Sequence, residues 1–301
     1  MAAPNQVSFP SAGPPGTGVR HRIGVCSWSL QPASPADLVA SLKPLRVDAV
    51  QLALSPIASG DAKWKDSIAH LRDAGIDILS GMVAMRGEDY STLQSIARTG
   101  GVRPDEHWDA NLALARSVAE IAARHRIGLV TFHAGFIPHD SADHSRGRML
   151  DRLGTIADVF RAAGVNIAFE TGQETALTLL DALEALNRLN VGVNFDPANM
   201  ILYGMGDPAE ALRLLAPRVR QIHIKDALPT RKPGTWGSET AAGAGAVDWP
   251  RFFDIALQIQ PPVNFIIERE AGEVGGRERD IAAARELIAK HLQAGRCQAA
   301  H

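Results

Sequence analysis

The sequence predicts an α/β fold, a single (β/α)8 TIM barrel in which parallel strands alternate with helices. Eight short runs along the chain are almost continuously apolar, as in parallel strands that are buried on both faces. Stretches with helical spacing separate these runs, and the chain has 301 residues where one such barrel needs about 250. No G-x-G-x-x-G motif follows the first run, which argues against a dinucleotide-binding sheet.

The individual elements follow from their composition and from the signals at their ends. The expected strands are Arg22–Trp28, Ala49–Leu54, Ile76–Val83, Gly128–His133, Asn166–Glu170, Gly192–Asp196, Gln221–Ile224 and Asn264–Glu268. The expected helices are Ala36–Leu42, Ala110–Arg126, Leu150–Ala163, Ala176–Leu189, Pro208–Leu215, Trp249–Gln260 and Glu278–Leu292. Ser34-Pro35 is a good N-terminal signal for the first helix, and turns with Gly or Asn follow the middle helices.

Three segments are expected along the chain. Residues 1–19 are rich in Pro, Gly, Ser and Ala and predict a short disordered N-terminal arm, residues 20–292 form the barrel, and residues 293–301 form a flexible tail. The arm lacks a charged start followed by an apolar region, so we do not expect a secretory signal. Within the barrel, Arg231–Val247 is too long for a simple connection, and long loops at a barrel mouth are usually functional.

The composition limits the partners of the chain. Lys and Arg total 31 and Asp and Glu total 33, so a formal charge of −2 predicts no strong attraction to nucleic acid or to a membrane surface. No apolar run approaches the ~20 residues that cross a bilayer. Cys26 lies in an expected core strand and Cys297 in the tail, which fits a reduced, cytoplasmic setting. The expected partner is a small-molecule carbohydrate. The sequence does not decide whether the chain forms a homo-oligomer.

Residues that bind metals stand at the ends of four apolar runs. Glu170, Asp196 and Glu268 close three of them, and His223 lies within the fourth. The carboxyl ends of barrel strands meet at one mouth, so these four side chains are expected to share one site. A lone acid at a strand end is most often a helix cap or an ion-pair partner, but four together favour a metal. Three oxygen donors and one nitrogen donor suit Mn²⁺ best, with Mg²⁺, Co²⁺, Fe²⁺ and Zn²⁺ as alternatives.

Three motifs surround these residues, namely Val193-Asn-Phe-Asp-Pro-Ala-Asn-Met, Gln221-Ile-His-Ile-Lys-Asp and Ile267-Glu-Arg-Glu-Ala-Gly. They resemble the sugar phosphate isomerase/epimerase group of the xylose-isomerase-like TIM barrels, a superfamily with endonuclease IV, inosose dehydratase and ketose 3-epimerases. The resemblance covers roughly Arg22 to Leu292. Similarity to the ketose 3-epimerases implies that the four metal ligands are Glu170, Asp196, His223 and Glu268, and that the two glutamates transfer protons.

The sequence departs from this group at Asn199, where ketose epimerases usually carry a histidine that contacts the substrate. The amide of Asn199 can bind a hydroxyl but does not titrate near neutral pH, which argues against a standard tagatose- or psicose-type substrate. The endonuclease relatives use three zinc ions, additional histidines and a basic DNA groove. The near-neutral charge of this chain and its one or two histidines at the mouth argue against that activity.

Two further side chains are expected to bind the substrate through polar groups. His133 ends the fourth expected strand. It is expected either to contact the substrate or to act as a base next to the residues that contact it. Lys225 shares a strand face with His223 and can bind a hydroxyl, carboxylate or phosphate. The alternative for Lys225 is an ion pair with Asp226 or with another acid.

Aromatic and neutral polar side chains complete the expected site. Trp28 and Trp236 can stack on the apolar face of a sugar, although Trp28 fits barrel packing equally well. Gln51 is expected to form neutral hydrogen bonds from the second strand. Glu270 shares a face with Glu268 and competes with it as a ligand, and the position of Glu268 at the end of the apolar run favours Glu268.

The leading function is a metal-dependent isomerase or epimerase of a sugar, keto-sugar or cyclitol. Removal of a proton beside a ketone gives an enediolate, which a divalent cation stabilises as a Lewis acid. Glu170 and Glu268 then remove and return the proton. A lyase or dehydratase acting on a 3-keto-sugar or inosose is the alternative, because elimination starts from the same enediolate. A non-catalytic carbohydrate-binding barrel is a second alternative.

Overall fold

Eight parallel strands form one closed barrel in the computed structural model, which describes residues 20–298. The strands are β1 (Ile23–Cys26), β2 (Ala49–Ala53), β3 (Asp77–Met82), β4 (Leu129–Phe132), β5 (Asn166–Glu170), β6 (Val191–Phe195), β7 (Val219–Ile224) and β10 (Asn264–Ile267). Their order is β1-β10-β7-β6-β5-β4-β3-β2, so the last strand closes on the first. The predicted fold is confirmed, and every predicted strand overlaps an observed one. Residues 1–19, the expected arm, and 299–301 lie outside the described residues.

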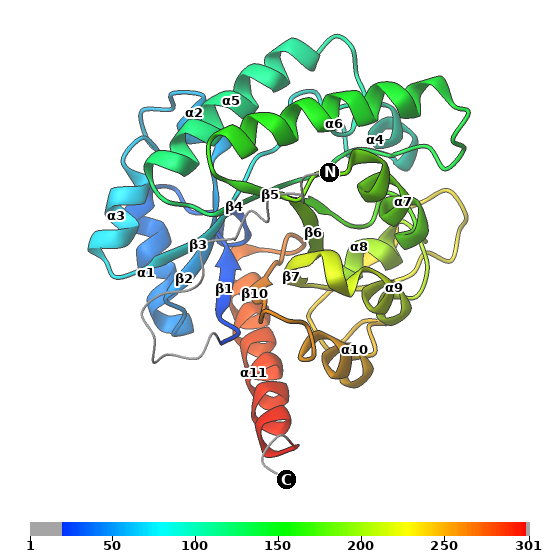
Figure 1. The fold of residues 1–301 in the computed structure, drawn as a ribbon. Coiled ribbons are helices and arrows are strands. Elements are labelled where there is room, and N and C mark those ends of the chain that lie inside the picture. The colour runs from blue at the N-terminus through cyan, green and yellow to red at the C-terminus, as the bar shows by residue number, and fades with distance from the viewer. Residues whose placement is uncertain (1–19, 299–301) are drawn as a thin grey trace, which may run out of the picture.

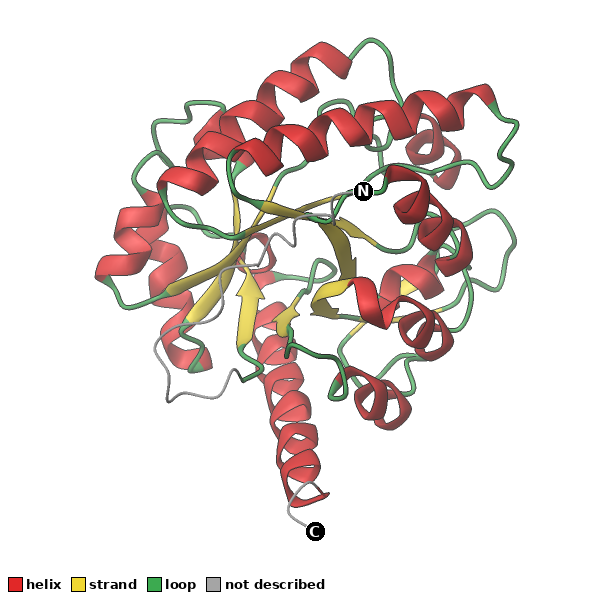
Figure 2. Ribbon diagram, in the orientation of Figure 1, coloured by secondary structure: helices red, strands yellow, loops and turns green. Residues whose placement is uncertain are grey.

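Helices form a layer around the outside of the barrel (Figures 1 and 2). They are α1 (Pro35–Leu45), α2 (Ser55–Ala58), α3 (Ser67–Asp73), α4 (Leu93–Thr99), α5 (Trp108–Arg124), α6 (His144–Ala162), α7 (Ala176–Leu186), α8 (Pro197–Leu202), α9 (Pro208–Leu215), α10 (Trp249–Ala256) and α11 (Val274–Gln298), with 3-10 turns at Ser27–Leu30 and Ala216–Arg218. The expected signal at α1 is present, because the Ser34 side chain accepts a hydrogen bond from the Asp37 amide. Among the described residues, no helix is long and apolar enough to cross a membrane.

The helices differ from the expected set in two ways. The short helices α2, α3, α4 and α8 were not expected, because four to seven residues are too few to show a clear periodicity. The last helix, expected at Glu278–Leu292, runs from Val274 to Gln298. Residues 293–298, which were expected to belong to a flexible tail, therefore continue the helix.

The long segment between β7 and α10 is partly folded as a hairpin. Strands β8 (Asp226–Leu228) and β9 (Ser238–Thr240) pair antiparallel, with Asp226 opposite Thr240. The buried carboxylate of Asp226 accepts hydrogen bonds from the Gly243 amide at 2.9 Å and from the Trp249 indole at 2.9 Å, and three more backbone amides lie within 3.1 Å. Asp226 therefore anchors the long segment to the barrel and does not pair with Lys225.

The centre of the barrel contains a buried polar network as well as apolar side chains. Gln221 accepts from the Ser80 hydroxyl at 2.6 Å and donates to Asn194 at 3.1 Å. Gln51 donates to the Thr131 hydroxyl at 2.7 Å. All five side chains are fully buried, so these hydrogen bonds offset the loss of water around them. The network lies under the strand ends and supports the side chains described next.

Candidate functional site

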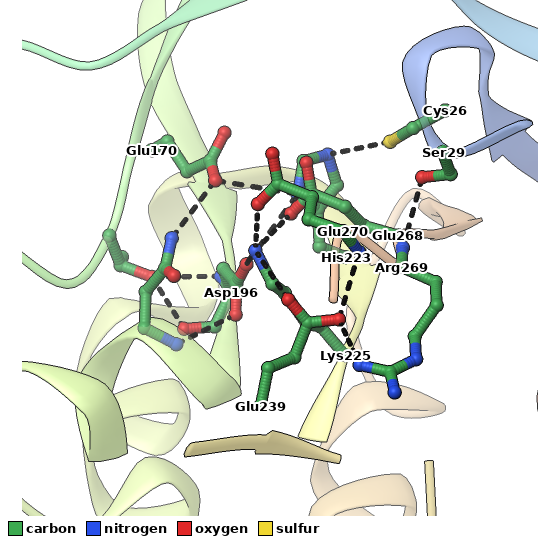
Figure 3. A network of polar contacts seen from close by, with 12 residues as sticks. Cys26, Ser29, Glu170, Asp196, His223, Lys225, Glu239, Glu268, Arg269 and Glu270 are labelled. Atoms are coloured by element: carbon green, nitrogen blue, oxygen red, sulfur yellow. Dashed lines mark hydrogen bonds and ion pairs between the residues drawn. The ribbon is translucent and has the colours of Figure 1, made fainter. Parts of the chain in front are cut away.

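Four side chains expected at the mouth converge on one buried cluster (Figure 3). Glu170 is the last residue of β5, Asp196 directly follows β6, His223 lies near the end of β7, and Glu268 directly follows β10. One ligand atom from each lies within 4.8 Å of the others, and all four residues are buried. This convergence follows from the parallel barrel, which brings the carboxyl ends of distant strands together.

The residues of this cluster fit a divalent metal ion. His223 Nδ1 lies 3.5 Å from Glu170 Oε1, 3.7 Å from Asp196 Oδ2 and 3.4 Å from Glu268 Oε2. Within residues 20–298, neither His223 Nδ1 nor Asp196 Oδ2 has a hydrogen-bond partner, although both atoms are buried. Unpaired buried polar atoms are costly, and a cation bound between them would satisfy both. One imidazole nitrogen and three carboxylates form a suitable donor set.

Gln51 sets the orientation of the His223 ring. His223 Nε2 lies 2.7 Å from Gln51 Oε1, an atom that can only accept a hydrogen bond. Nε2 also lies 3.0 Å from Asn194 Nδ2, so both contacts hold this side of the ring against the barrel interior. Nδ1 therefore faces the carboxylates, as a ligand atom requires. Burial alone would lower the pKa of His223, but acidic neighbours that include Glu170 and Glu268 hold this pKa well above its usual value.

Amide groups hold the carboxylate of Glu170. Asn199 donates to its Oε1 at 3.0 Å, and Asn194 donates to its Oε2 at 3.1 Å. His133 Nε2 lies 3.8 Å from Oε1. Burial alone would raise the pKa of Glu170, but the imidazoles of His133 and His223 outweigh this effect and lower it. The expected substrate residues His133 and Asn199 therefore lie beside an expected base.

A cation and an indole hold the carboxylate of Glu268. Lys225 donates to its Oε2 at 2.9 Å, and Trp28 donates to its Oε1 at 2.8 Å. Lys225 also donates to Glu270 Oε2 at 2.6 Å, so it pairs with these two acids. Burial would raise the pKa of Glu268, but Lys225 and His223 hold it well below its usual range. Glu270 is 52% exposed and lies outside the four-residue cluster.

A cavity of about 770 Å³ opens onto this cluster. Its walls include all five residues expected to bind substrate, namely Trp28, His133, Asn199, Lys225 and Trp236. Trp236 packs edge-on against Tyr203, with ring centroids 4.8 Å apart, so the two form an aromatic wall. Such a volume is typical of small-molecule sites, which combine apolar walls with a few placed polar groups.

The sequence did not reveal four residues that also line this cavity, namely Glu88, Tyr90, Tyr203 and Glu239. Glu239 lies on β9, and its Oε1 accepts from Arg269 Nη1 at 2.5 Å and from the Glu270 amide at 2.9 Å. Burial raises the pKa of Glu88, although His133 partly opposes the shift. Neither glutamate ends an apolar run, so their positions carried no signal like that of Glu170. The unusual length of the Arg231–Val247 segment was the only indication of a role near Glu239.

The fold and the cluster define a TIM barrel with a candidate metal centre at its mouth. The sequence matches the Xylose isomerase-like TIM barrel family over residues 42–291, and the chain belongs to this family. A xylose isomerase domain protein from Planctomyces limnophilus is 32% identical, with a TM-score of 0.79 over 84% of this chain and 91% of that protein. The uncharacterized protein YihM from Escherichia coli K12 is 32% identical over 112 residues, which cover 32% of this chain and only 34% of YihM.

More distant solved structures share the fold. A D-psicose 3-epimerase from Clostridium cellulolyticum H10, solved with D-tagatose, has a TM-score of 0.65 and 16% identity over 90% of this chain and 99% of that protein. A xylose isomerase-like barrel from Mycobacterium smegmatis in complex with magnesium has a TM-score of 0.68 and 16% identity over 90% and 98%. The probable 3-DHS dehydratase AsbF from Bacillus anthracis has a TM-score of 0.66 and 14% identity over 89% and 98%.

Proposed function

We propose that this protein is a divalent-metal-dependent isomerase or epimerase that acts on a sugar, keto-sugar or cyclitol. The observation that carries the proposal is the pair of buried carboxylates, Glu170 and Glu268, which lie 3.5 and 3.4 Å from the same His223 nitrogen and line the same cavity. They come from β5 and β10, which β6 and β7 separate around the barrel. Two carboxylates can therefore reach a bound substrate from different sides.

Glu170, Asp196, His223 and Glu268 are the residues that would hold the metal ion. When bound there, a divalent ion would supply Lewis-acid stabilisation for negative charge on a substrate oxygen. We propose Mn²⁺, because three carboxylates and one imidazole suit a cation of intermediate hardness. A relative with the same fold was solved with magnesium, so Mg²⁺ is the first alternative. Elemental analysis of the purified protein tests this choice.

The two glutamates are proposed to carry out the two proton transfers of the reaction. One carboxylate removes the proton beside the substrate carbonyl, which gives an enediolate, and the other returns a proton to the opposite face. Asn194 and Asn199 hold Glu170 in position from one side, whereas Trp28 and Lys225 hold Glu268 from the other. These hydrogen bonds fix both carboxylates before the substrate arrives, which is the geometric requirement for efficient proton transfer.

The cavity walls are proposed to bind the remainder of the substrate. His133, Asn199 and Lys225 offer hydrogen bonds to hydroxyl groups. Trp28 and Trp236 offer aromatic surfaces that can cover an apolar sugar face. The D-psicose 3-epimerase and other sugar epimerases of the same fold support a carbohydrate as the substrate class.

Solvent exchange tests this function directly. The purified protein would be loaded with Mn²⁺ and incubated in D₂O with ketoses, 3-keto-glucosides and inososes, and NMR would follow deuterium at the carbon beside the carbonyl. We expect deuterium uptake and an inverted or isomerised product with at least one class, and neither in Asp196→Ala. Metal-dependent binding without any uptake would instead indicate the non-catalytic carbohydrate-binding barrel.

A lyase or dehydratase is the second candidate, and Glu88 favours it. This cavity-lining carboxyl has a pKa raised by burial, so a larger fraction of it carries a proton that could pass to a departing hydroxyl. The fold shared with a probable 3-DHS dehydratase also supports elimination. In the same NMR assay, a dehydratase gives an unsaturated product, whereas an epimerase gives only the second sugar.

A further inference from the structure

A second cavity of about 510 Å³ lies beside the first and shares no lining residue with it. Its walls come mainly from the segments that follow β4 and β5, and from the segment between α8 and α9. Phe136 lines the second cavity and packs edge-on against Tyr203 of the first, with ring centroids 5.5 Å apart. An aromatic pair therefore lies between the two cavities.

Gln173 gives this cavity an unused hydrogen-bonding group. Its side chain is almost fully buried, at 2% exposure, and lines the cavity. Neither its Nε2 nor its Oε1 has a partner at hydrogen-bonding geometry in the part of the chain that the structure describes, although the amide lies near enough to the Tyr203 hydroxyl to oppose the rise that burial causes in the pKa of Tyr203. A buried amide without hydrogen-bond partners is destabilising. Such a group is usually satisfied by an ordered water molecule, an ion or a ligand. The amide can donate and accept at once, as a pair of neighbouring hydroxyls requires.

Other polar groups in the cavity suit the same kind of ligand. His139 Nδ1 lies 2.8 Å from the Thr178 hydroxyl, which lies 3.0 Å from the Thr175 hydroxyl. Glu174 is buried beside them, and burial raises its pKa to about 8, so its carboxyl is mostly protonated at neutral pH. A protonated carboxyl both donates and accepts, like the hydroxyls and the amide around it.

The charges of the cavity disfavour an ionic ligand. Arg103 donates to the Phe136 carbonyl at 3.2 Å and is the one lysine or arginine among the lining residues that the structure describes. Two aspartates also line the cavity, with Asp143 accepting from the Ser145 amide at 2.7 Å and Asp140 from the Ala142 amide at 2.9 Å. The two carboxylates would repel an anion, and Arg103 would repel a cation.

We propose that this second cavity binds a neutral, polyhydroxylated ring, a sugar or cyclitol unit, through the side-chain amide of Gln173. The hydroxyls of such a ring match the amide, the threonines and His139, and its apolar face matches the ring of Phe136. The ring is either a free sugar or the second unit of a longer substrate. This inference goes beyond the proposed function, because it needs neither a metal ion nor catalysis.

The test measures sugar binding to the metal-free full-length protein. Glucose, myo-inositol, a glucose disaccharide and inorganic phosphate would be compared by saturation-transfer NMR titration, with soaked crystals locating the bound molecule. We expect a neutral probe beside Gln173, and a loss of roughly tenfold in affinity in Gln173→Leu. This variant should fold, because it removes a buried polar group that has no partner. Tighter binding of the disaccharide than of glucose would show that the ring is the second unit of a longer substrate. Equal binding of the two would show that the ring is a free sugar.

Two controls separate this site from the metal centre. Thr240→Val also removes a buried hydroxyl without a partner among the described residues, but Thr240 lines neither cavity, so sugar affinity should stay unchanged. Glu170→Gln alters the metal cluster and should leave binding at Gln173 intact, whether or not the proposed reaction exists. The inference is overturned if no neutral probe binds, if phosphate alone binds, or if Gln173→Leu binds sugar as the unaltered protein does.

Discussion

Glu170 and Glu268 are the same residue type in one cluster, but their surroundings differ. Neutral amides from Asn194 and Asn199 hold Glu170, and an imidazole lies at 3.8 Å. Glu268 is in direct contact with the ammonium group of Lys225 at 2.9 Å. Its pKa is held well below the usual range, whereas that of Glu170 is lowered less strongly. Glu170 is therefore held by two neutral amides and lies near two imidazoles, whereas Glu268 is in direct contact with an ammonium group.

This difference assigns different roles to the two carboxylates. The ammonium group of Lys225 in contact with Glu268 weakens this carboxylate as a proton acceptor, so we propose Glu170 as the base for the first proton removal. Glu268 is then the weaker base and the stronger acid, which suits it to return a proton to the opposite face.

The largest effect on metal binding and turnover is expected from the two residues that lie between Glu170 and Glu268. Asp196→Ala and His223→Ala remove two of the proposed metal ligands, which lie between the glutamates around the barrel, and each should abolish stoichiometric metal binding and measurable turnover. The barrel core should keep the protein folded, because the large cluster of buried apolar side chains contains none of the four proposed ligands. Elemental analysis and circular dichroism check both points. If both variants kept the metal content of the original protein, the proposed metal site would be wrong.

Glutamine at each glutamate tests the assignment of the base. Glu170→Gln should lower turnover toward the upper end of the roughly 10²–10⁴-fold range of general acid–base groups, and should stop solvent deuterium exchange. Glu268→Gln should lower turnover while exchange continues without inversion. Deuterium NMR separates the two outcomes. Full turnover in both variants would exclude the mechanism with two carboxylates.

Stability should also differ between the two sides. Lys225→Met leaves Glu268 and Glu270 without their cation and should lower the free energy of unfolding by about 3–5 kcal/mol. Asn199→Ala removes one amide hydrogen bond to Glu170 and should lower it by about 1.5–3 kcal/mol. Arg213→Ala, which breaks a half-exposed ion pair with Glu210, should change it by less than about 1 kcal/mol. Urea denaturation of the metal-free protein measures all three, and a smaller effect for Lys225→Met than for Asn199→Ala would contradict the comparison.

Glu174 extends the comparison to a buried carboxyl that no cation stabilises. Burial raises its pKa from 4.5 to about 8, so the folded protein binds a proton that the unfolded chain releases, and stability falls as pH rises through this interval. Glu174→Gln should remove that dependence and stabilise the protein by up to about 3 kcal/mol at pH 7, with little change at pH 4.5. Denaturation at several pH values tests this. Parallel pH profiles for the variant and the original protein would mean that Glu174 titrates normally.

The strand ends show how far the sequence could be interpreted. Glu170, Asp196 and Glu268 each close a short apolar run, which is the pattern of a parallel strand buried on both faces, and helical stretches separate these runs. The barrel and the meeting of these side chains could therefore be predicted. The partners of Lys225 could not be predicted, because Asp226 and other acids were equally possible from the sequence. Only the tertiary structure shows that the Asp226 carboxylate accepts hydrogen bonds from the Gly243 amide and the Trp249 indole instead.

From the sequence one could predict the barrel, its eight strands, its longer helices and the four residues that meet at its mouth, since these follow from patterns within single segments. The tertiary structure decided which contacts these residues form. Gln51 orients His223 from a distance of 172 residues, and Gln173 is left without a partner beside a second cavity. Such contacts depend on the relative positions of segments that are distant in the chain, and no local pattern encodes them.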